Sequence, residues 1–127
     1  MKILTVEDND INAMLMDRLM TELDFPVEHT VIDNGEEAIV ESKGNTFDLI
    51  LMDINLGDGV MNGSEVLKEL RHSDHYKNTP IFAITCYALP GDKERFLEEG
   101  FSEYISKPID HQLLLGKITS YKESLKI

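Results

Sequence analysis

Leu49-Ile50-Leu51-Met52 is a short, wholly apolar run that ends at Asp53. A continuous apolar run of this length predicts a strand that is buried on both faces. Strands of that kind belong to parallel sheets whose two faces are covered by helices. The carboxylate of Asp53 is therefore expected at the edge of such a sheet, where the strand ends.

Strand-like and helix-like segments alternate along the rest of the chain. Further strands are predicted at residues 2–6, 27–32, 81–84 and 103–105. Helices are predicted from residue 10 to the segment before Pro26, and at residues 36–43, 64–73, 90–100 and from 110 onward. Five consecutive strand–helix units predict an α/β fold with a parallel sheet between two layers of helices.

The first predicted helix has its own start and stop signals. Asn9 or Asp10 can cap its start, and Pro26 ends it. Its apolar residues at helical spacing are Ile11, Met14, Leu15, Leu19 and Leu23. This spacing predicts that these five side chains face the core.

The composition indicates one acidic globular domain over residues 1–127. Acidic residues number 24 and basic residues 12, so the net charge is −12. Such a charge repels nucleic acid and anionic membrane surfaces, so neither is expected as a partner. Cys86 is the only cysteine, and no apolar run approaches the ~20 residues of a membrane span, so a reducing cytoplasm is expected.

Polar side chains stand at the ends of four predicted strands. Glu7 and Asp8 follow the first strand, Asp53 the third, Thr85 the fourth and Lys107 the fifth. Ligands of open α/β sheets bind beyond the carboxyl ends of the strands. These five side chains are therefore expected to converge on one site.

The chemistry of this set points to phosphoryl transfer. Three carboxylates close together repel one another, and a bound cation would neutralise their charge. Mg²⁺ is the expected cation because it prefers oxygen ligands. The four histidines do not have the spacing of zinc ligands. Asp53 can accept a phosphoryl group as an acyl phosphate, and the metal would neutralise charge on that group. Lys107 would add a second positive charge, and Thr85 a hydrogen bond to a phosphate oxygen.

Each of these residues also has a plain structural interpretation. Glu7 and Asp8 can cap the first helix, because carboxylates favour helix N-termini. Asp53 can be an ordinary strand end, Lys107 a surface lysine and Thr85 a helix cap. The joint occurrence of all five at successive strand ends favours the functional interpretation.

The set Glu7-Asp8, Asp53, Thr85 and Lys107-Pro108 resembles the receiver domain of response regulators, over essentially the whole chain. The resemblance implies a doubly wound, flavodoxin-like (βα)5 fold with strand order 2-1-3-4-5. It also implies a stand-alone signalling switch of a two-component system rather than an enzyme.

The resemblance further implies a role for each residue around the acceptor. Asp53 is the phosphoacceptor, supplied by a histidine kinase or a histidine phosphotransfer protein. Asp8 and Asp53 bind Mg²⁺ directly, together with the backbone carbonyl of Asn55. Glu7 acts through a metal-bound water.

On the opposite side of the phosphoryl group, Lys107 is expected to contact it, and the Lys107-Pro108 peptide bond is expected to be cis. Thr85 and Tyr104 are implied as the switch pair, in which the hydroxyl moves toward phosphate and the aromatic ring turns inward behind it. The face formed by the fourth helix, the fifth strand and the fifth helix then changes its affinity for a downstream protein. The protein is expected to be a monomer or a weak, phosphorylation-dependent dimer.

The chain departs from the family pattern at several positions. Gly57 stands where proline is usual, in a loop from Asp53 to Gly63 that is longer than usual, and Asn62 stands where aspartate is frequent. Cys86 replaces a small alanine and is expected to narrow access to Asp53. Tyr87 is expected near the mouth of the site, and residues 85–92 are similar to receivers associated with hybrid histidine kinases.

Two other functions stay open on the sequence. A Mg²⁺-dependent phosphatase of the aspartyl-phosphate type also uses a strand-end aspartate, but it places a second aspartate two residues later, where this chain has Asn55. A structural receiver that acts without phosphorylation would not need the complete set of acidic, threonine and lysine residues.

Overall fold

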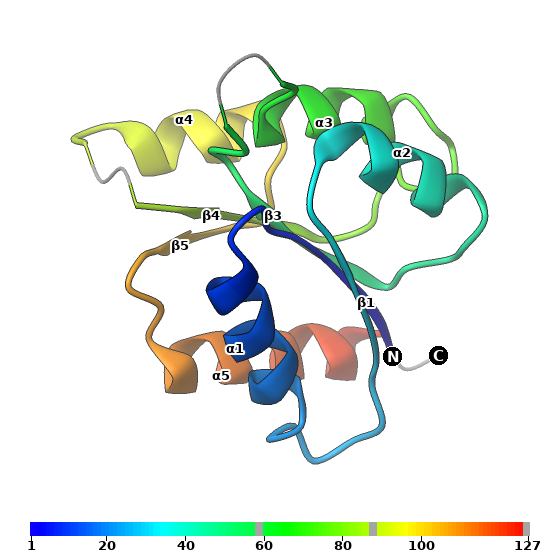
Figure 1. Ribbon diagram of the computed structural model, residues 1–127, viewed down its shortest axis with the longest axis vertical. Helices are drawn as coiled ribbons and strands as arrows, with labels where there is room; N and C mark the ends of the chain where they lie inside the picture. The colour runs from blue at the N-terminus through cyan, green and yellow to red at the C-terminus, as the bar shows by residue number, and fades with distance from the viewer. Residues whose placement is uncertain (58–59, 87–88, 126–127) are drawn as a thin grey trace.

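The computed structural model describes residues 1–57, 60–86 and 89–125. Within them, strands and helices alternate along the chain, as Figure 1 shows. The strands are β1 (Lys2–Val6), β2 (Glu28–Ile32), β3 (Leu49–Asp53), β4 (Ile81–Thr85) and β5 (Glu103–Ser106). The helices are α1 (Asp10–Met20), α2 (Gly35–Lys43), α3 (Gly63–Arg71), α4 (Asp92–Glu99) and α5 (His111–Ser124).

The five strands form one parallel sheet in the order β2-β1-β3-β4-β5. The predicted fold class and strand order are therefore confirmed. In the register of the sheet, Met52 pairs with both Val6 and Ala83, so the carboxyl ends of β1, β3 and β4 lie at the same edge. The sequence predicts that the polar residues at the strand ends meet at this edge.

Helices cover both faces of the sheet, with α1 and α5 on one face and α2, α3 and α4 on the other (Figure 1). Alternate residues of β3 serve the two layers: Ile50 and Met52 pack toward α2, α3 and α4, and Leu49 and Leu51 toward α1 and α5. Because every β3 side chain enters one core or the other, the run has no polar residue before Asp53.

Asparagine side chains fix the starts of three helices. Asn9, rather than Asp10, caps α1 by accepting a hydrogen bond from the backbone N–H of Asn12 at 2.9 Å. Asn34 caps α2 in the same way. Asn62 forms a reciprocal capping box with Glu65 at the start of α3, so this departure from the family pattern has a local structural role.

The predicted core face of α1 is wrong in part. Ile11, Met14 and Leu15 are 69%, 72% and 52% exposed. The residues of α1 that enter the core are Met16, Leu19 and Met20. The helix has apolar residues on two faces, and the sequence pattern alone does not show which face meets the sheet. Helix α1 also ends at Met20, and Leu23, beyond its end, packs against the core while partly buried.

No helix among the described residues has the length and apolar character that crossing a bilayer requires.

Candidate functional site

The carboxyl ends of three strands bring Glu7, Asp53 and Lys107 into contact. Asp53 is the last residue of β3, Glu7 follows β1 and Lys107 follows β5. The Nζ atom of Lys107 lies 3.1 Å from Oε2 of Glu7 and 3.1 Å from Oδ2 of Asp53. Residues that are distant in sequence therefore form one charged cluster.

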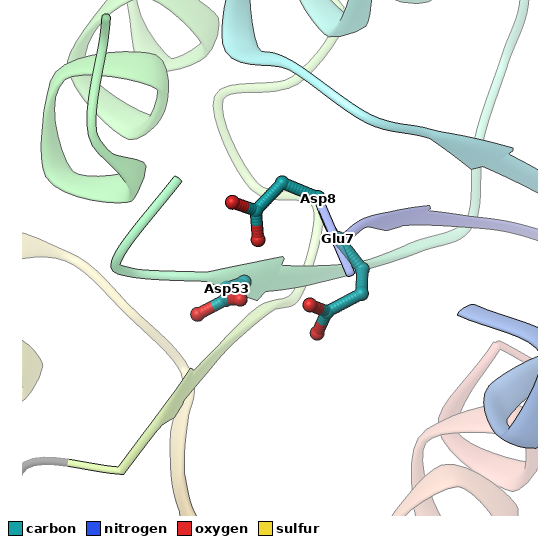
Figure 2. Close-up of side chains that lie close together, drawn as sticks. All are labelled: Glu7, Asp8 and Asp53. Carbon is teal, nitrogen blue, oxygen red and sulfur yellow. The ribbon is translucent and has the colours of Figure 1, made fainter. Parts of the chain in front are cut away.

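Asp8 joins Glu7 and Asp53 to form an acidic cluster of three carboxylates. Figure 2 shows the carboxylates of Glu7, Asp8 and Asp53 gathered at the ends of their strands. One carboxylate oxygen from each residue lies within 4.8 Å of the other two. Glu7 and Asp53 are buried, whereas Asp8 is exposed. This acidic cluster offers carboxylate oxygens, which are the ligands that a hard cation such as Mg²⁺ prefers.

The environment of the acidic cluster shifts the pKa values of Asp53 and of the neighbouring Lys107. Burial, and then the charge of Glu7, raise the pKa of Asp53 to about 6, although Lys107 acts in the opposite direction. Burial alone would lower the pKa of Lys107, but Asp53 and Glu7 outweigh it, so the pKa of Lys107 lies above its ordinary value. Lys107 thus stays an ammonium, and Asp53, mainly because it is buried, keeps its proton to a higher pH than an exposed aspartate does.

The acidic cluster opens into a cavity of about 260 Å³, lined by Glu7, Asp8, Asn9, Asn12, Asp53, Asn55, Gly57, Cys86 and Lys107. Asn55 lies beside Asp53, because its backbone N–H donates a hydrogen bond to Oδ1 of Asp53 at 3.2 Å. The lining is rich in carboxylate and amide oxygens, which fits a magnesium ion better than a zinc ion.

Thr85 and Tyr104 lie on the same face of the sheet. Ala83 packs into the core beneath α4, and Thr85 follows it by two residues in the same strand, so both side chains point to that face. Tyr104 pairs with Ala83 across β4 and β5 and packs against the same core. Thr85 is buried, and Tyr104 is half-buried.

The backbone around the site has two special conformations. The Lys107–Pro108 peptide bond is cis, in agreement with the expectation. Gly57 has φ of 110°, which a proline cannot adopt because its ring holds φ near −65°. The glycine that replaces the usual proline is therefore required by the path of this loop.

Cys86 is exposed and lines the cavity that contains Asp53. The effect of the Cys86 side chain on access to Asp53 stays a prediction. Tyr87 lies outside the described residues.

A larger groove lies beside the acidic cluster, and it is not among the sites predicted from the sequence. Its volume is about 480 Å³, and its lining is mainly apolar, from Leu15, Met16, Leu19, Pro108 and Ile109, with Glu7, Asn12, Cys86, Lys107 and His111 at its polar parts. It shares Glu7, Asn12, Cys86 and Lys107 with the smaller cavity. The feature of the sequence that indicates this groove is that α1 carries apolar residues on two faces.

The chain resembles known proteins over nearly its whole length. A family model described as the response regulator receiver domain matches residues 3–119. The signal transduction histidine-protein kinase BarA of Escherichia coli (strain K12) is 35% identical over 123 residues, which are 96% of this chain and 13% of that kinase. The polar-differentiation response regulator DivK of Brucella anthropi is 37% identical over 119 residues, which are 94% of each protein.

Solved structures of similar proteins have the same fold as this chain. The receiver domain of a sensor histidine kinase from Pseudomonas aeruginosa PAO1, with a magnesium ion coordinated in its active site cleft, superposes with a TM-score of 0.82 at 30% identity, covering 94% of this chain and 95% of that one. The chemotaxis protein CheY4 of Vibrio cholerae gives a TM-score of 0.82 at 27% identity, covering 94% and 97%. With this fold and this match over residues 3–119, the chain belongs to the response regulator receiver family, which works as a signalling switch in two-component systems.

Proposed function

We propose that Asp53 accepts a phosphoryl group from a phosphohistidine donor, and that this modification switches a binding surface elsewhere on the domain. The observation that supports this most strongly is the contact of Lys107 Nζ with both Asp53 and Glu7, each at 3.1 Å. A lysine held between two buried carboxylates is costly for stability alone, because each charge must lose its water. It is useful where a negatively charged group must be received.

Mg²⁺ is the cofactor of this proposal. Asp8 and Asp53 would hold it directly with the backbone carbonyl of Asn55, and Glu7 would act through a bound water. Support comes from the carboxylate oxygens of the acidic cluster, which lie within 4.8 Å of one another. When bound, the ion neutralises negative charge on the carboxylates and on the incoming phosphoryl group.

The transfer step needs an ionised acceptor. With a pKa of about 6, Asp53 is mostly a carboxylate at neutral pH. Its oxygen forms a bond to phosphorus as the phosphorus–nitrogen bond of the donor histidine breaks, and the electron pair of that bond returns to the imidazole. Lys107, already beside Asp53, interacts with the phosphoryl oxygens and stabilises their charge.

The switch connects the phosphoryl group to the face of α4, β5 and α5. Thr85 would donate a hydrogen bond to a phosphate oxygen, and Tyr104 would turn inward on the same face of the sheet. Phosphate then favours the conformation in which Thr85 and Lys107 both reach it, so the population of that conformation rises. A downstream protein binds that conformation in preference to the resting one.

The phosphodonor is a histidine kinase or a histidine phosphotransfer protein. Ile11, Met14 and Leu15 of α1 form an exposed apolar surface, and Leu15 also lines the groove that adjoins the acidic cluster. Exposed apolar surface next to a reactive group indicates a protein-binding site. The donor would dock on this α1 surface with its phosphohistidine directed at Asp53. A cytoplasmic location, and a monomer or weak phosphorylation-dependent dimer, belong to the same proposal.

The test is phosphorylation by a small donor. Purified protein is incubated with acetyl phosphate, with and without Mg²⁺, and followed by intact mass. We expect one added phosphoryl group that requires Mg²⁺, decays slowly, is absent in Asp53→Asn and is retained in Asp33→Asn, an exposed-loop control. Multiple turnover on phosphate esters would support a phosphatase instead, and no modification would support a structural receiver.

A further inference from the structure

Asp92 is a buried carboxylate outside the acidic cluster. It is the first residue of α4, and its side chain is 9% exposed. Its Oδ2 accepts a hydrogen bond from the backbone N–H of Leu89 at 3.0 Å, which ties a residue before the helix to the first helical residue. Its other oxygen, Oδ1, lies 3.2 Å from Nη2 of Arg95. Asp92 therefore fixes both the start of α4 and the position of Arg95.

A chain of ring contacts leads from Arg95 to the switch residue. The guanidinium carbon of Arg95 lies 4.7 Å from the centre of the Phe96 ring. Phe96 is buried, and its ring stacks on that of Tyr104 with centres 6.0 Å apart and an angle of 20° between the planes. Arg95 and Tyr104 thus contact the same aromatic ring, in geometries that are attractive.

The charge of Asp92 is a second link to Tyr104. Burial, and after it the negative charge of Asp92, raise the pKa of the Tyr104 hydroxyl above its ordinary value. Two routes, one through Arg95 and Phe96 and one through charge, connect the first turn of α4 with Tyr104.

We propose that Asp92 is a positioning residue for the switch: together with Arg95 and Phe96 it holds Tyr104 in its resting, half-buried orientation. This inference rests on the proposed function, in which Tyr104 turns inward after phosphorylation. In this proposal, the inward turn separates the ring of Tyr104 from that of Phe96. Asp92 thereby sets the fraction of unphosphorylated protein that already adopts the active conformation.

The test follows Tyr104 by fluorine NMR. The chain has four tyrosines. The protein is labelled with 3-fluorotyrosine, the Tyr104 signal is assigned with Tyr104→Phe, and its active position is defined with Mg²⁺ and beryllofluoride. Without beryllofluoride, we expect Asp92→Asn to increase the active fraction roughly two- to tenfold, the range for losing one aromatic or charge contact. Glu94→Gln, an exposed carboxylate in the same helical turn, should leave the signal at its wild-type position.

A second variant protects the test against a folding defect. Arg95→Ala removes a side chain that is 60% exposed, so it should not disturb the core, and it should shift Tyr104 in the same direction. If Tyr104 responds to beryllofluoride but both variants keep the wild-type signal, the inference is overturned while the proposed function stands. If beryllofluoride leaves Tyr104 unmoved in the wild-type protein, the switch role of Tyr104 and this inference both fail.

Discussion

The ammonium of Lys107 lies 3.1 Å from the carboxylate of Asp53, although 54 residues separate the two in sequence. The contact exists because β3 and β5 run parallel and both end at the same edge of the sheet. It has a cost, since a lysine and two buried carboxylates give up hydration to form it.

Removing the ammonium should impair phosphoryl transfer. Lys107→Ala leaves Glu7 and Asp53 side by side without their shared cation, and it removes the positive charge that would face the phosphoryl group. We expect phosphorylation by acetyl phosphate to slow by roughly a hundredfold, the usual loss when one charge-stabilising group is removed. Lys117→Ala, whose ammonium pairs with Glu103 at 2.8 Å, is the matched control and should keep the wild-type rate. Equal rates in the two variants would contradict a role for Lys107.

Metal binding should depend on Asp8. Asp8→Asn keeps the shape of the side chain but removes the exposed negative charge of the acidic cluster. We expect Mg²⁺ affinity, measured by calorimetry or by amide chemical shifts, to fall at least about tenfold, because hard cations bind charged oxygen ligands. Asp10→Asn changes an exposed carboxylate outside the acidic cluster and should have little effect. A full-affinity Asp8→Asn protein would place the metal elsewhere.

The contribution of Asp53 to the stability of the metal-free protein should fall as the pH rises from about 4 to 6. The pKa of Asp53 is raised from 3.8 to about 6 by folding, so between these values the folded protein binds a proton that the unfolded chain has released. Stability from this proton is present below pH 3.8 and lost as the pH passes through about 6. The difference in unfolding free energy between wild type and Asp53→Asn, from urea denaturation without Mg²⁺, should change in this window. A difference that stays constant across it would contradict the raised pKa.

The exposed face of α1 should matter for a protein donor and not for a small one. Met14 is 72% exposed, so Met14→Glu should leave the fold intact. We expect transfer from a phosphorylated histidine phosphotransfer protein or kinase to slow about tenfold or more, as when an interface contact is lost. Phosphorylation by acetyl phosphate should be unchanged. Val40→Glu on α2, where Val40 is 68% exposed, is the control for adding a surface charge. A Met14→Glu protein that receives phosphate at the wild-type rate would exclude this docking surface.

The sequence predicts the sheet well because its signals are local and repeated. The apolar run at residues 49–52 and the alternation of elements are sufficient for the fold class, and the position of polar residues at strand ends predicts the convergence of Glu7, Asp53 and Lys107. The orientation of α1 was not predictable in the same way. Both faces of α1 carry apolar residues. Only packing against the sheet determines that Met16 is buried while its neighbours Met14 and Leu15 are exposed.

The sequence does not predict the contacts of Asp92, and the reason is a different one. As a residue after Pro90-Gly91, it looks like an ordinary helix start, and its burial follows from the way α4 packs beside β5. The stack of Phe96 on Tyr104 joins a helix to a strand across a turn, and no spacing rule specifies it. The sequence therefore predicts that Glu7, Asp53 and Lys107 converge, but not the side-chain contacts around Tyr104.

The most direct test of the central claim identifies the modified residue chemically. The protein is phosphorylated with acetyl phosphate and Mg²⁺, an acyl phosphate is reduced with borohydride to give homoserine, and peptides are sequenced by mass spectrometry. We predict homoserine at position 53. Its amount should depend on Mg²⁺ and should be much lower in Lys107→Ala than in the wild-type protein. Modification at another carboxylate, or equal modification without Mg²⁺, would contradict a single magnesium-dependent acceptor site at Asp53.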